Sequence, residues 1–372
     1  MIRLIYPHVP YEPVAKKLKR VTQTGILTQG EYVKELESKL KKIVGSRYAF
    51  TTTSATTALH LSLAALQIGP GDEVLVANFT FPATGNVVVQ VGATPVLVDI
   101  TLPDYTINIQ DLEKKITSRT KAIIPVDTFG FPCNMPEIIK IAKRHNLHVI
   151  EDAACAIGAS IGGKRCGNFE GTGCFSFHPR KSITTGEGGL LTTNDKKIAK
   201  RVSILRNHGG VFNKQIGFYQ FEMAGFNYRL SELQAIVGLS QITSLFPTIN
   251  KRRKIAARYT KLFASKRPDV VTPKDQPGRK HTYQSYVVLL PKGSDRNSII
   301  KKMKRHGIET TLGTYALHMQ PYYQKKYKYH NNSLPQSTKA FTRALTLPLH
   351  DRLTLKDQEQ IVSMLISFLP RL

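Results

Sequence analysis

The chain has 372 residues, of which 41% are hydrophobic and 21% charged, an ordinary balance for a globular protein that is long enough for two domains. No apolar run reaches the roughly 20 residues that cross a bilayer, and Pro7 interrupts the N-terminal segment too early for a signal peptide. We therefore expect a cytoplasmic protein with no membrane partner. The four cysteines form no Cys-x-x-Cys pair, which argues against a zinc site or a disulfide framework, and we expect no metal.

The formal net charge of +27 is concentrated in residues 251–372, which carry 25 lysines and arginines against 7 acidic residues. Such a surface could favour nucleic acid or an anionic small molecule, or it could be an ordinary solvated lysine-rich surface. Aromatic residues are not interleaved with the basic segments as they are in RNA-binding surfaces. Charge alone therefore does not favour a nucleic-acid partner.

Apolar residues at three- and four-residue spacing predict two helices within residues 11–44, joined by the glycine-bounded loop 24–30. A short β-prone segment near Phe50 then leads into a helix, for which Thr53 or Ser54 is the expected N-cap. Free amides at this helix N-terminus could also bind a phosphate group. Many helices begin with serine or threonine, so this motif alone is weak evidence of a site.

From residue 73 short apolar strands alternate with helices. The predicted strands are 73–76, 94–98, 122–126 and 147–150, and the predicted helices between them are 84–91, 109–116 and 135–145. This alternation predicts an α/β fold with a mainly parallel sheet that is covered on both faces. Asp127, Asp152 and residues 79–81 each follow a strand, where ligands bind in such sheets.

The C-terminal part has a different pattern. A helical pattern runs from Leu230 to Leu245, and after Pro247 a basic helix is expected over 249–264. The composition then changes, and the further elements expected are a strand at 283–290 and helices at 296–306 and 355–369. These patterns predict a large domain over 1–250 and a smaller α+β domain over 251–372.

The segment from Gly158 to Arg165 has the glycine and lysine spacing of a P-loop. Arg165, however, stands where a serine or threonine must bind Mg²⁺. Gly162 and Gly163 are also typical of a β-hairpin turn, and we favour the hairpin.

Asp152 and Lys181 together suggest a cofactor. Asp152 ends an apolar run, and Lys181 follows a second hydrophobic strand and precedes the glycine-rich segment 184–189. Pyridoxal phosphate needs an amine for a Schiff base, a carboxylate at its ring nitrogen, an anion-binding segment and a flat group over its ring. Taken singly, a strand-capping aspartate and a surface lysine would be the simpler interpretations.

The segment 151–189, with Ser176-Phe177-His178-Pro179-x-Lys181 and Thr184-Thr185-Gly186-Glu187-Gly188-Gly189, resembles the signature of a known family. This is the DegT/DnrJ/EryC1/StrS family of sugar aminotransferases, which make amino-deoxysugars from nucleotide-linked keto-sugars. The similarity extends over most of the chain and includes residues 27–30, 54–59, 79–84, 225–230 and 307–318.

The resemblance implies a fold-type-I enzyme that uses pyridoxal 5′-phosphate and works as a homodimer with shared active sites. Lys181 would hold the cofactor as a Schiff base and move the proton, Asp152 would pair with the ring nitrogen, and Phe81 would stack on the ring. The phosphate contacts it implies are the backbone of Ala55 and Thr56, the side chain of Ser176, and Asn227 reaching across from the second subunit.

The resemblance also implies substrate contacts at Thr28, Gly30, Arg229 and Tyr315. The expected activity is transfer of an amino group from an amino acid, L-glutamate, to a nucleotide-linked 4-keto-6-deoxyhexose, for amino-sugar and surface-polysaccharide biosynthesis. The family's sugar dehydratases carry histidine where this chain has Lys181, which favours amino transfer. A dehydratase, and a non-catalytic basic regulator that associates with nucleic acid, stay open as alternatives.

Two positions depart from the family pattern. By the resemblance, Cys155 would stand beside the phenolic oxygen of the ring, where many members have glutamine, and a thiol is a poorer hydrogen-bonding group. Asp127 stands where histidine is common, and the sequence does not assign it a role.

Overall fold

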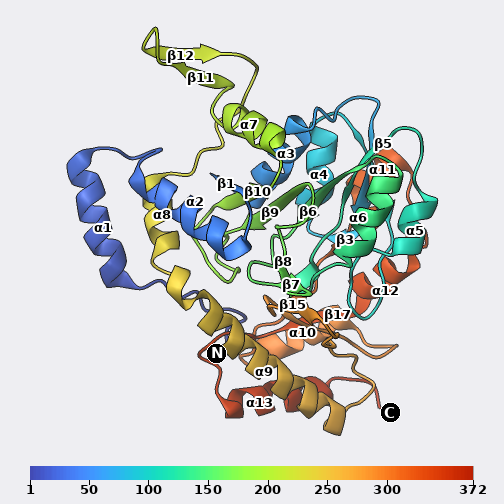
Figure 1. The fold of residues 1–372 in the computed structure, drawn as a ribbon. Coiled ribbons are helices and arrows are strands. Elements are labelled where there is room, and N and C mark those ends of the chain that lie inside the picture. The colour runs from blue at the N-terminus through green and yellow to red at the C-terminus, as the bar shows by residue number, and fades with distance from the viewer. Residues whose placement is uncertain (372) are drawn as a thin grey trace.

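The computed structural model describes residues 1–371, in which a large α/β lobe lies beside a smaller α+β lobe (Figure 1). The large lobe is built on a seven-stranded sheet with the order β1-β10-β9-β6-β5-β2-β4. Its strands are β1 (Tyr48–Thr52), β2 (Glu73–Ala77), β4 (Thr94–Val98), β5 (Thr120–Ile124), β6 (His148–Asp152), β9 (Thr172–Ser176) and β10 (Gly189–Thr193). Strands from β9 to β4 are parallel, and β10 is antiparallel to both of its neighbours. The α/β prediction and its mainly parallel sheet are confirmed.

Helices cover both faces of this sheet because its strands are apolar on both sides. Alternate strand residues pack against α3 (Ala55–Ala65) and α4 (Ala83–Gln90) on one face. The residues between them pack against α5 (Ile109–Lys114) and α6 (Met135–Arg144) on the other. A further core forms between β9, β10 and the helices α2 (Glu31–Val44) and α8 (Glu232–Leu239). The remaining helices of this lobe are α1 (Tyr11–Thr24), α7 (Lys196–Leu205), α11 (Pro321–Tyr327) and α12 (Pro335–Arg343).

The small lobe has its own apolar core. Its sheet consists of β14 (Tyr286–Leu289), β17 (Ala344–Leu347) and β15 (Thr311–Leu312). Its helices are α9 (Leu245–Lys266), α10 (Arg296–Arg305) and α13 (Leu355–Ser367). Ile2 also belongs to this lobe, because its amide donates to the carbonyl of Gly307 at 2.7 Å. The division at residue 250 falls inside α9 and stays a prediction.

The expected helix break at Pro247 is wrong. The predicted continuous helix ends at Leu239, a short 3₁₀ turn follows at Ile242–Ser244, and α9 begins at Leu245. Pro247 therefore lies in the first turn of α9, where backbone amides have no intrahelical acceptor and proline costs no hydrogen bond. The strand expected at 283–290 begins later, at Tyr286, because Tyr283 has a positive φ of 49°.

Two hairpins lie outside the seven-stranded sheet. The first joins β7 (Ser160–Ile161) to β8 (Lys164–Arg165) through Gly162 and Gly163, which both have positive φ, so the hairpin prediction is confirmed over the P-loop. The second, formed by β11 (Gly210–Asn213) and β12 (Phe218–Phe221), projects from the large lobe (Figure 1).

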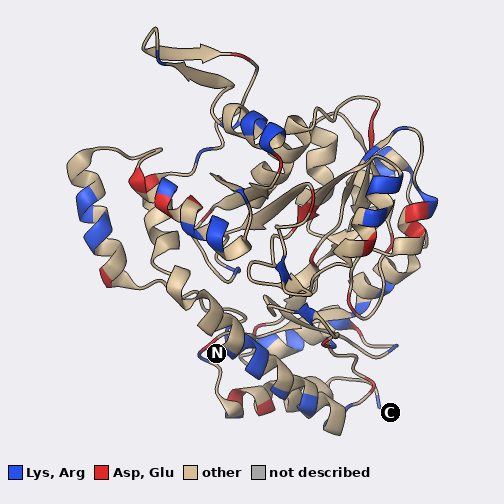
Figure 2. Ribbon diagram, viewed as in Figure 1, with Lys and Arg blue, Asp and Glu red and all other residues tan. Residues whose placement is uncertain are grey.

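Basic residues are spread over both lobes and are frequent along α9, as Figure 2 shows. Within residues 1–371 no helix is both long enough and apolar enough to span a membrane. All four cysteines are free, and Cys155 is the one that is partly exposed.

Candidate active site

Asp152 lies at the carboxyl end of β6 and is 4% exposed. Its Oδ2 accepts a hydrogen bond of 2.7 Å from Thr84 Oγ1, and its Oδ1 accepts one of 3.2 Å from the Ala154 amide. Burial raises the pKa of Asp152 above its ordinary value, while these two hydrogen bonds and the charge of Lys181 act to lower it. A partner that carries positive charge or an N–H group would therefore stabilise the ionised carboxylate.

Lys181 lies beyond the end of β9, in a segment held by three side chains from other elements. Its Nζ donates to Cys155 Sγ at 3.0 Å, so the lysine and the thiol meet beside Asp152. Gln284 donates to the carbonyl of Arg180 at 2.7 Å, and Arg252 donates to Ser182 Oγ at 3.2 Å.

The third of these side chains is Gln241. It accepts from the Thr184 amide at 3.1 Å and donates to the Thr184 carbonyl at 2.7 Å. Because the residues that flank Lys181 on both sides are fixed in this way, its side chain starts from a defined backbone position.

The N-terminus of α3 lies next to the start of β10. Ser54 is the N-cap, and its hydroxyl accepts the Thr57 amide at 3.1 Å in a capping box, which confirms one of the two expected caps. The amides of Ala55 and Thr56, in the first turn, have no intrahelical acceptor. A Cβ on Gly189 would lie 2.4 Å from the Ser54 carbonyl carbon, so only glycine permits this approach.

Ser176, the residue paired with Gly189 across the sheet, lies at this same edge. The first amides of α3 and the hydroxyl of Ser176 are the kinds of group that a phosphate-binding site uses.

The rings of Phe81 and Tyr315 lie next to each other. Phe81 follows β3 (Phe79–Thr80), and its ring is 65% exposed. Tyr315 comes from β16 (Tyr315–Ala316), which pairs with β3, and the two ring centroids are 6.2 Å apart with the planes at 67°. An exposed ring at this position is available to pack on a flat ligand.

A second group of predicted residues is held around a buried glutamate. Glu232 is 1% exposed and accepts hydrogen bonds from the amides of Gly30, Tyr32 and Val33 at 2.9–3.0 Å. A backbone bridge joins exposed Thr28 to Ser231 in the same region. The substrate-contact candidates of the 27–30 loop are thereby fixed to the start of α8.

Arg229 and Asn227 lie in the segment that leads into α8. Arg229 Nη1 donates to Asn207 Oδ1, and a backbone bridge joins Asn207 to Asn227. Asn227 is exposed, and no contact of the described chain connects its side chain to Lys181. The structure thus forms one group around Lys181 and Asp152 and a second around Thr28 and Arg229.

The first group fits pyridoxal phosphate. Lys181 supplies an amine, Asp152 a carboxylate whose ionised form needs a partner, the N-terminus of α3 an anion-binding site, and Phe81 an exposed ring.

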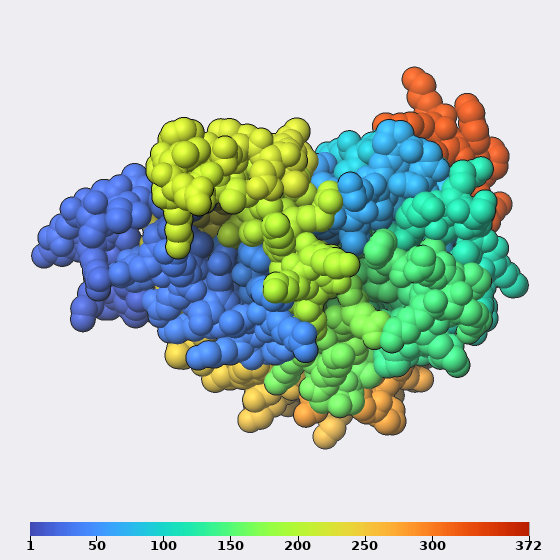
Figure 3. Space-filling model, turned by 45° about the horizontal axis from the view of Figure 1, so that its top comes forward, coloured from blue at the N-terminus to red at the C-terminus, as the bar shows by residue number. Residues whose placement is uncertain are grey.

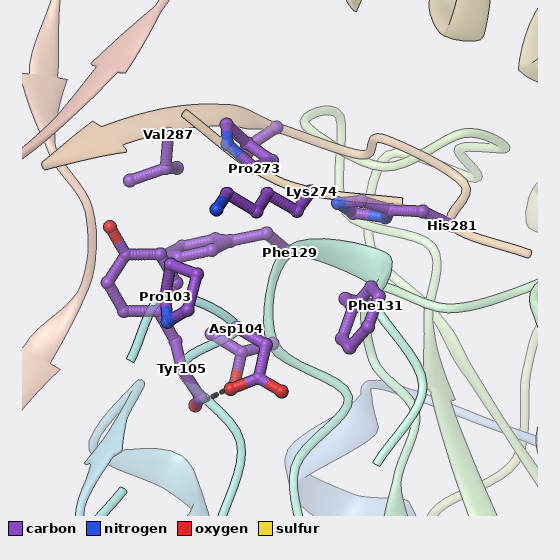
Figure 4. Close-up of a pocket in the computed structure, with 11 residues that line it drawn as sticks. Pro103, Asp104, Tyr105, Phe129, Phe131, Pro273, Lys274, His281 and Val287 are labelled. Atoms are coloured by element: carbon purple, nitrogen blue, oxygen red, sulfur yellow. Dashed lines mark hydrogen bonds between the residues drawn. The ribbon is translucent and has the colours of Figure 1, made fainter. Parts of the chain in front are cut away.

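A different cleft lies between the lobes and is lined mainly by aromatic and apolar side chains (Figure 4). Tyr105, Phe129, Phe131, Lys274 and His281 line it, and none of the predicted site residues does. Burial lowers the pKa of His281 to about 3, so its ring is neutral at physiological pH, and it accepts the Tyr283 amide at 3.0 Å. Asp104 and Lys274 also line this cleft, but no hydrogen bond or ion pair joins the two within residues 1–371.

Three residues that support the site were not identified from the sequence: Thr84, Gln241 and Glu232. The sequence places Thr84 only in the family-like segment 79–84 and at the start of the predicted helix 84–91. It places Gln241 and Glu232 only within the helical pattern from Leu230 to Leu245. Buried polar residues on the apolar side of a helix were the one available signal, since such groups need a partner.

Comparison with known proteins agrees with this geometry. Residues 11–366 match the model of the DegT/DnrJ/EryC1/StrS aminotransferase family. GDP-perosamine synthase from Caulobacter vibrioides is 37% identical over 350 residues, covering 94% of this chain and 93% of that protein. Spore coat polysaccharide biosynthesis protein SpsC from Bacillus subtilis is 33% identical over 361 residues, covering 93% and 92%.

Among solved structures, the PLP-form of the putative sugar aminotransferase Spr1654 from Streptococcus pneumoniae superimposes with a TM-score of 0.91. The two chains are 26% identical, and the match covers 99% of this chain and 98% of that one.

Proposed function

Because the chain belongs to the DegT/DnrJ/EryC1/StrS aminotransferase family, we propose that this sugar aminotransferase moves the amino group of L-glutamate to a nucleotide-linked keto-sugar. Its cofactor is pyridoxal 5′-phosphate. A 4-keto-6-deoxyhexose is the proposed acceptor class, for amino-sugar biosynthesis. The name of the Caulobacter relative, GDP-perosamine synthase, contains a nucleotide-linked amino sugar and supports a nucleotide-linked acceptor.

The observation that carries the proposal is the convergence of Lys181 and Asp152 at the carboxyl ends of neighbouring parallel strands. When bound, the cofactor supplies an electron sink for the carbon that loses a proton. Lys181 Nζ takes that proton and returns it at a different carbon, which requires an amine that is free and mobile. The fixed segment around Lys181 limits where its amine can reach, so the proton is returned from one side.

Asp152 has the complementary role of holding the proton on the ring nitrogen. Its buried carboxylate favours a positive partner, and the hydroxyl of Thr84 orients Oδ2. Ala55, Thr56 and Ser176 would bind the phosphate, and Phe81 would exclude water from one ring face. Cys155 accepts a hydrogen bond from Lys181 Nζ, and in this proposal its thiol would face the ring's phenolic oxygen.

The acceptor sugar would bind between the 27–30 loop, Arg229 and Tyr315. Arg229 supplies a cationic fork suited to a diphosphate, and Thr28 is exposed for contact with a sugar. Glu232 fixes the loop of Thr28, and Asn207 holds the segment of Arg229, so this part of the site has a defined shape.

A homodimer with shared active sites is part of the proposal. Figure 3 shows the hairpin of β11 and β12 standing out from the molecule, and its side chains Phe212, Phe218 and Phe221 are 51%, 61% and 69% exposed. Exposed aromatic side chains of this number favour a protein partner. Asn227, near the base of this hairpin, is exposed and could contribute to a second subunit's site.

Mixing two inactive variants tests the shared site. Lys181→Ala and Asn227→Ala homodimers should each have little activity, whereas subunit exchange should restore about a quarter of wild-type activity through one intact site per mixed dimer. No recovery, although subunit exchange is shown by mass spectrometry, would contradict the assignment of Asn227 to the neighbouring site.

The reaction itself is tested with a panel of keto-sugar nucleotides and glutamate, with 2-oxoglutarate and the amino sugar measured as products. Borohydride reduction should attach the cofactor to the peptide that contains Lys181. Lys181→Ala should lower kcat by about 10²–10⁴-fold, the usual contribution of a positioned proton-transfer group. Turnover of a sugar without glutamate would identify a dehydratase instead.

A further inference from the structure

Two buried carboxyl groups lie behind Asp152 and take no part in the proposed reaction. Asp127 follows β5 and is 1% exposed, and Glu151, in β6, is 2% exposed. Because successive strand residues point to opposite faces of a sheet, Glu151 lies on the face away from Asp152. Neither Asp127 nor Glu151 forms an ion pair within residues 1–371.

Each of these carboxyl groups has one satisfied oxygen and one that lacks a partner. Asp127 Oδ1 accepts the Cys133 amide at 2.9 Å, and Glu151 Oε2 accepts the Gly167 amide at 2.8 Å. Asp127 Oδ2 and Glu151 Oε1 are buried and have no donor. An oxygen of each carboxyl group and the Sγ of Cys166 lie within 4.8 Å of one another.

Two ionised carboxylates at this separation in a buried site would repel strongly, and each would have an unsatisfied oxygen. One proton removes both problems, because it lowers the charge of the pair to −1 and joins the two free oxygens by a hydrogen bond. We propose that Asp127 and Glu151 share a single proton and act as one unit that positions the carboxyl end of β6, and hence Asp152.

The connection to Asp152 runs through the backbone. The Asp127 amide donates to the Asp152 carbonyl at 3.0 Å, and the Asp152 amide donates to the Pro125 carbonyl at 2.9 Å. Asp127 therefore ties the segment that follows β5 to the end of β6, through its amide and, in this proposal, through its carboxyl group. The importance of this position for catalysis rests on the proposed function, whereas the shared proton does not.

Titratable groups that face the pair agree with a retained proton. Burial raises the pKa of Asp127 and outweighs the hydrogen bonds from Glu151, the Cys133 amide and Cys166, which act to lower it, and the nearby charge of Asp152 adds to the rise. Burial and then the charge of Asp127 raise the pKa of Glu151 well above its usual range. Burial followed by the charges of both carboxyl groups also raises the pKa of the Cys166 and Cys133 thiols, so both thiols remain protonated.

Infrared spectroscopy of the holoenzyme tests the shared proton directly. Wild-type protein should show the carbonyl stretch of a buried carboxylic acid, and both Asp127→Asn and Glu151→Gln should lack it, since an amide N–H then replaces the proton. Glu73→Gln is the control: burial acts to raise the pKa of Glu73, but hydrogen bonds from Thr117 and Arg119 outweigh it and lower the pKa. The control should therefore keep the band.

Thermal unfolding gives a second readout that needs no activity. The folded pair keeps its proton while the unfolded chain loses it above about pH 4, so the native state loses stability as pH rises towards the pKa of the pair. Asp127→Asn should not lose stability in this way. The Tm of Asp127→Asn minus that of wild type should therefore increase by about 2 °C per pH unit between pH 5 and 8. Asp127→Ala should lower Tm throughout this range, because the buried Oε1 of Glu151 is left without a partner while Oε2 keeps the Gly167 amide.

Three results would overturn the proposal. The first is a carboxylic-acid band that survives in both Asp127→Asn and Glu151→Gln. The second is a Tm difference between Asp127→Asn and wild type that does not change with pH. The third is a Tm of Asp127→Ala that is as high as that of Asp127→Asn. A stoichiometric metal ion in the purified holoenzyme, whose removal by EDTA lowers Tm in wild type and not in Glu151→Gln, would assign the cluster to metal binding instead.

Discussion

Replacing Thr84 by valine is expected to weaken Asp152 without changing the shape of the site. Thr84 is fully buried in α4, and its Oγ1 donates to Asp152 Oδ2 at 2.7 Å while it also meets Thr80 Oγ1 at 2.8 Å. Valine keeps the volume and branching of threonine but has no hydroxyl. A hydrogen bond to an ionised group contributes about 1.5–3 kcal/mol, so its loss should raise the pKa of Asp152 by about 1–2 units.

The pH dependence of kcat/KM measures this change. The acid limb of the Thr84→Val profile should move up by about 1–2 pH units, and kcat/KM just above the wild-type limb should fall by about 10–100-fold. Because the folded pKa of Asp152 is already raised, a further rise costs stability as pH increases, so the Tm deficit should be larger at pH 8 than at pH 5.

Thr84→Ser is the matched control, because it keeps the hydroxyl and loses one methyl group. Its acid limb should stay close to that of wild type, although the small cavity should lower Tm slightly. A valine variant with an unchanged acid limb, or a serine variant that shifts as far as valine does, would refute the role given to this hydrogen bond.

Two further substitutions test how the cofactor site is held. Gly189→Ala would place a Cβ 2.4 Å from the Ser54 carbonyl, so the N-terminus of α3 must move, and we expect the Kd for pyridoxal phosphate to rise about tenfold or more by absorbance titration. Gly69→Ala, where the nearest atom would be 3.6 Å away, should leave that Kd unchanged. Gln241→Leu should lower the free energy of unfolding by about 2–4 kcal/mol in calorimetry, because the amide and carbonyl of Thr184 both lose a buried partner.

The regular elements of the large lobe could be predicted from the sequence because each follows a local rule. Buried Val/Ile/Leu runs correspond to the parallel strands, and three- and four-residue spacing corresponds to α1 and α2. Asp152 and Lys181 could be identified because both follow strands whose carboxyl ends meet at one edge.

Features that depend on tertiary contacts could not be predicted in the same way. Pro247 was expected to separate two helices, whereas its place in the first turn of α9 depends on the 3₁₀ turn before it. The sequence shows Glu232 only as part of a helical pattern. Its role depends on three backbone amides, about 200 residues away in the chain, that donate hydrogen bonds to it. Its burial is stabilised by those partners, which no local pattern describes.

The cofactor and the acceptor differ in how strongly the fold constrains their residues. Asp152, Thr84 and the N-terminus of α3 are held by regular elements and buried hydrogen bonds, so substitution there disturbs the core as well as the chemistry. Thr28, which is proposed to contact the acceptor, is exposed and lies in the irregular 27–30 loop. Changes at exposed loop positions usually cost little stability, so acceptor specificity can diverge while the cofactor site stays the same. Exchanging the 27–30 loop with that of a relative should therefore alter acceptor preference while Glu232 keeps the loop attached.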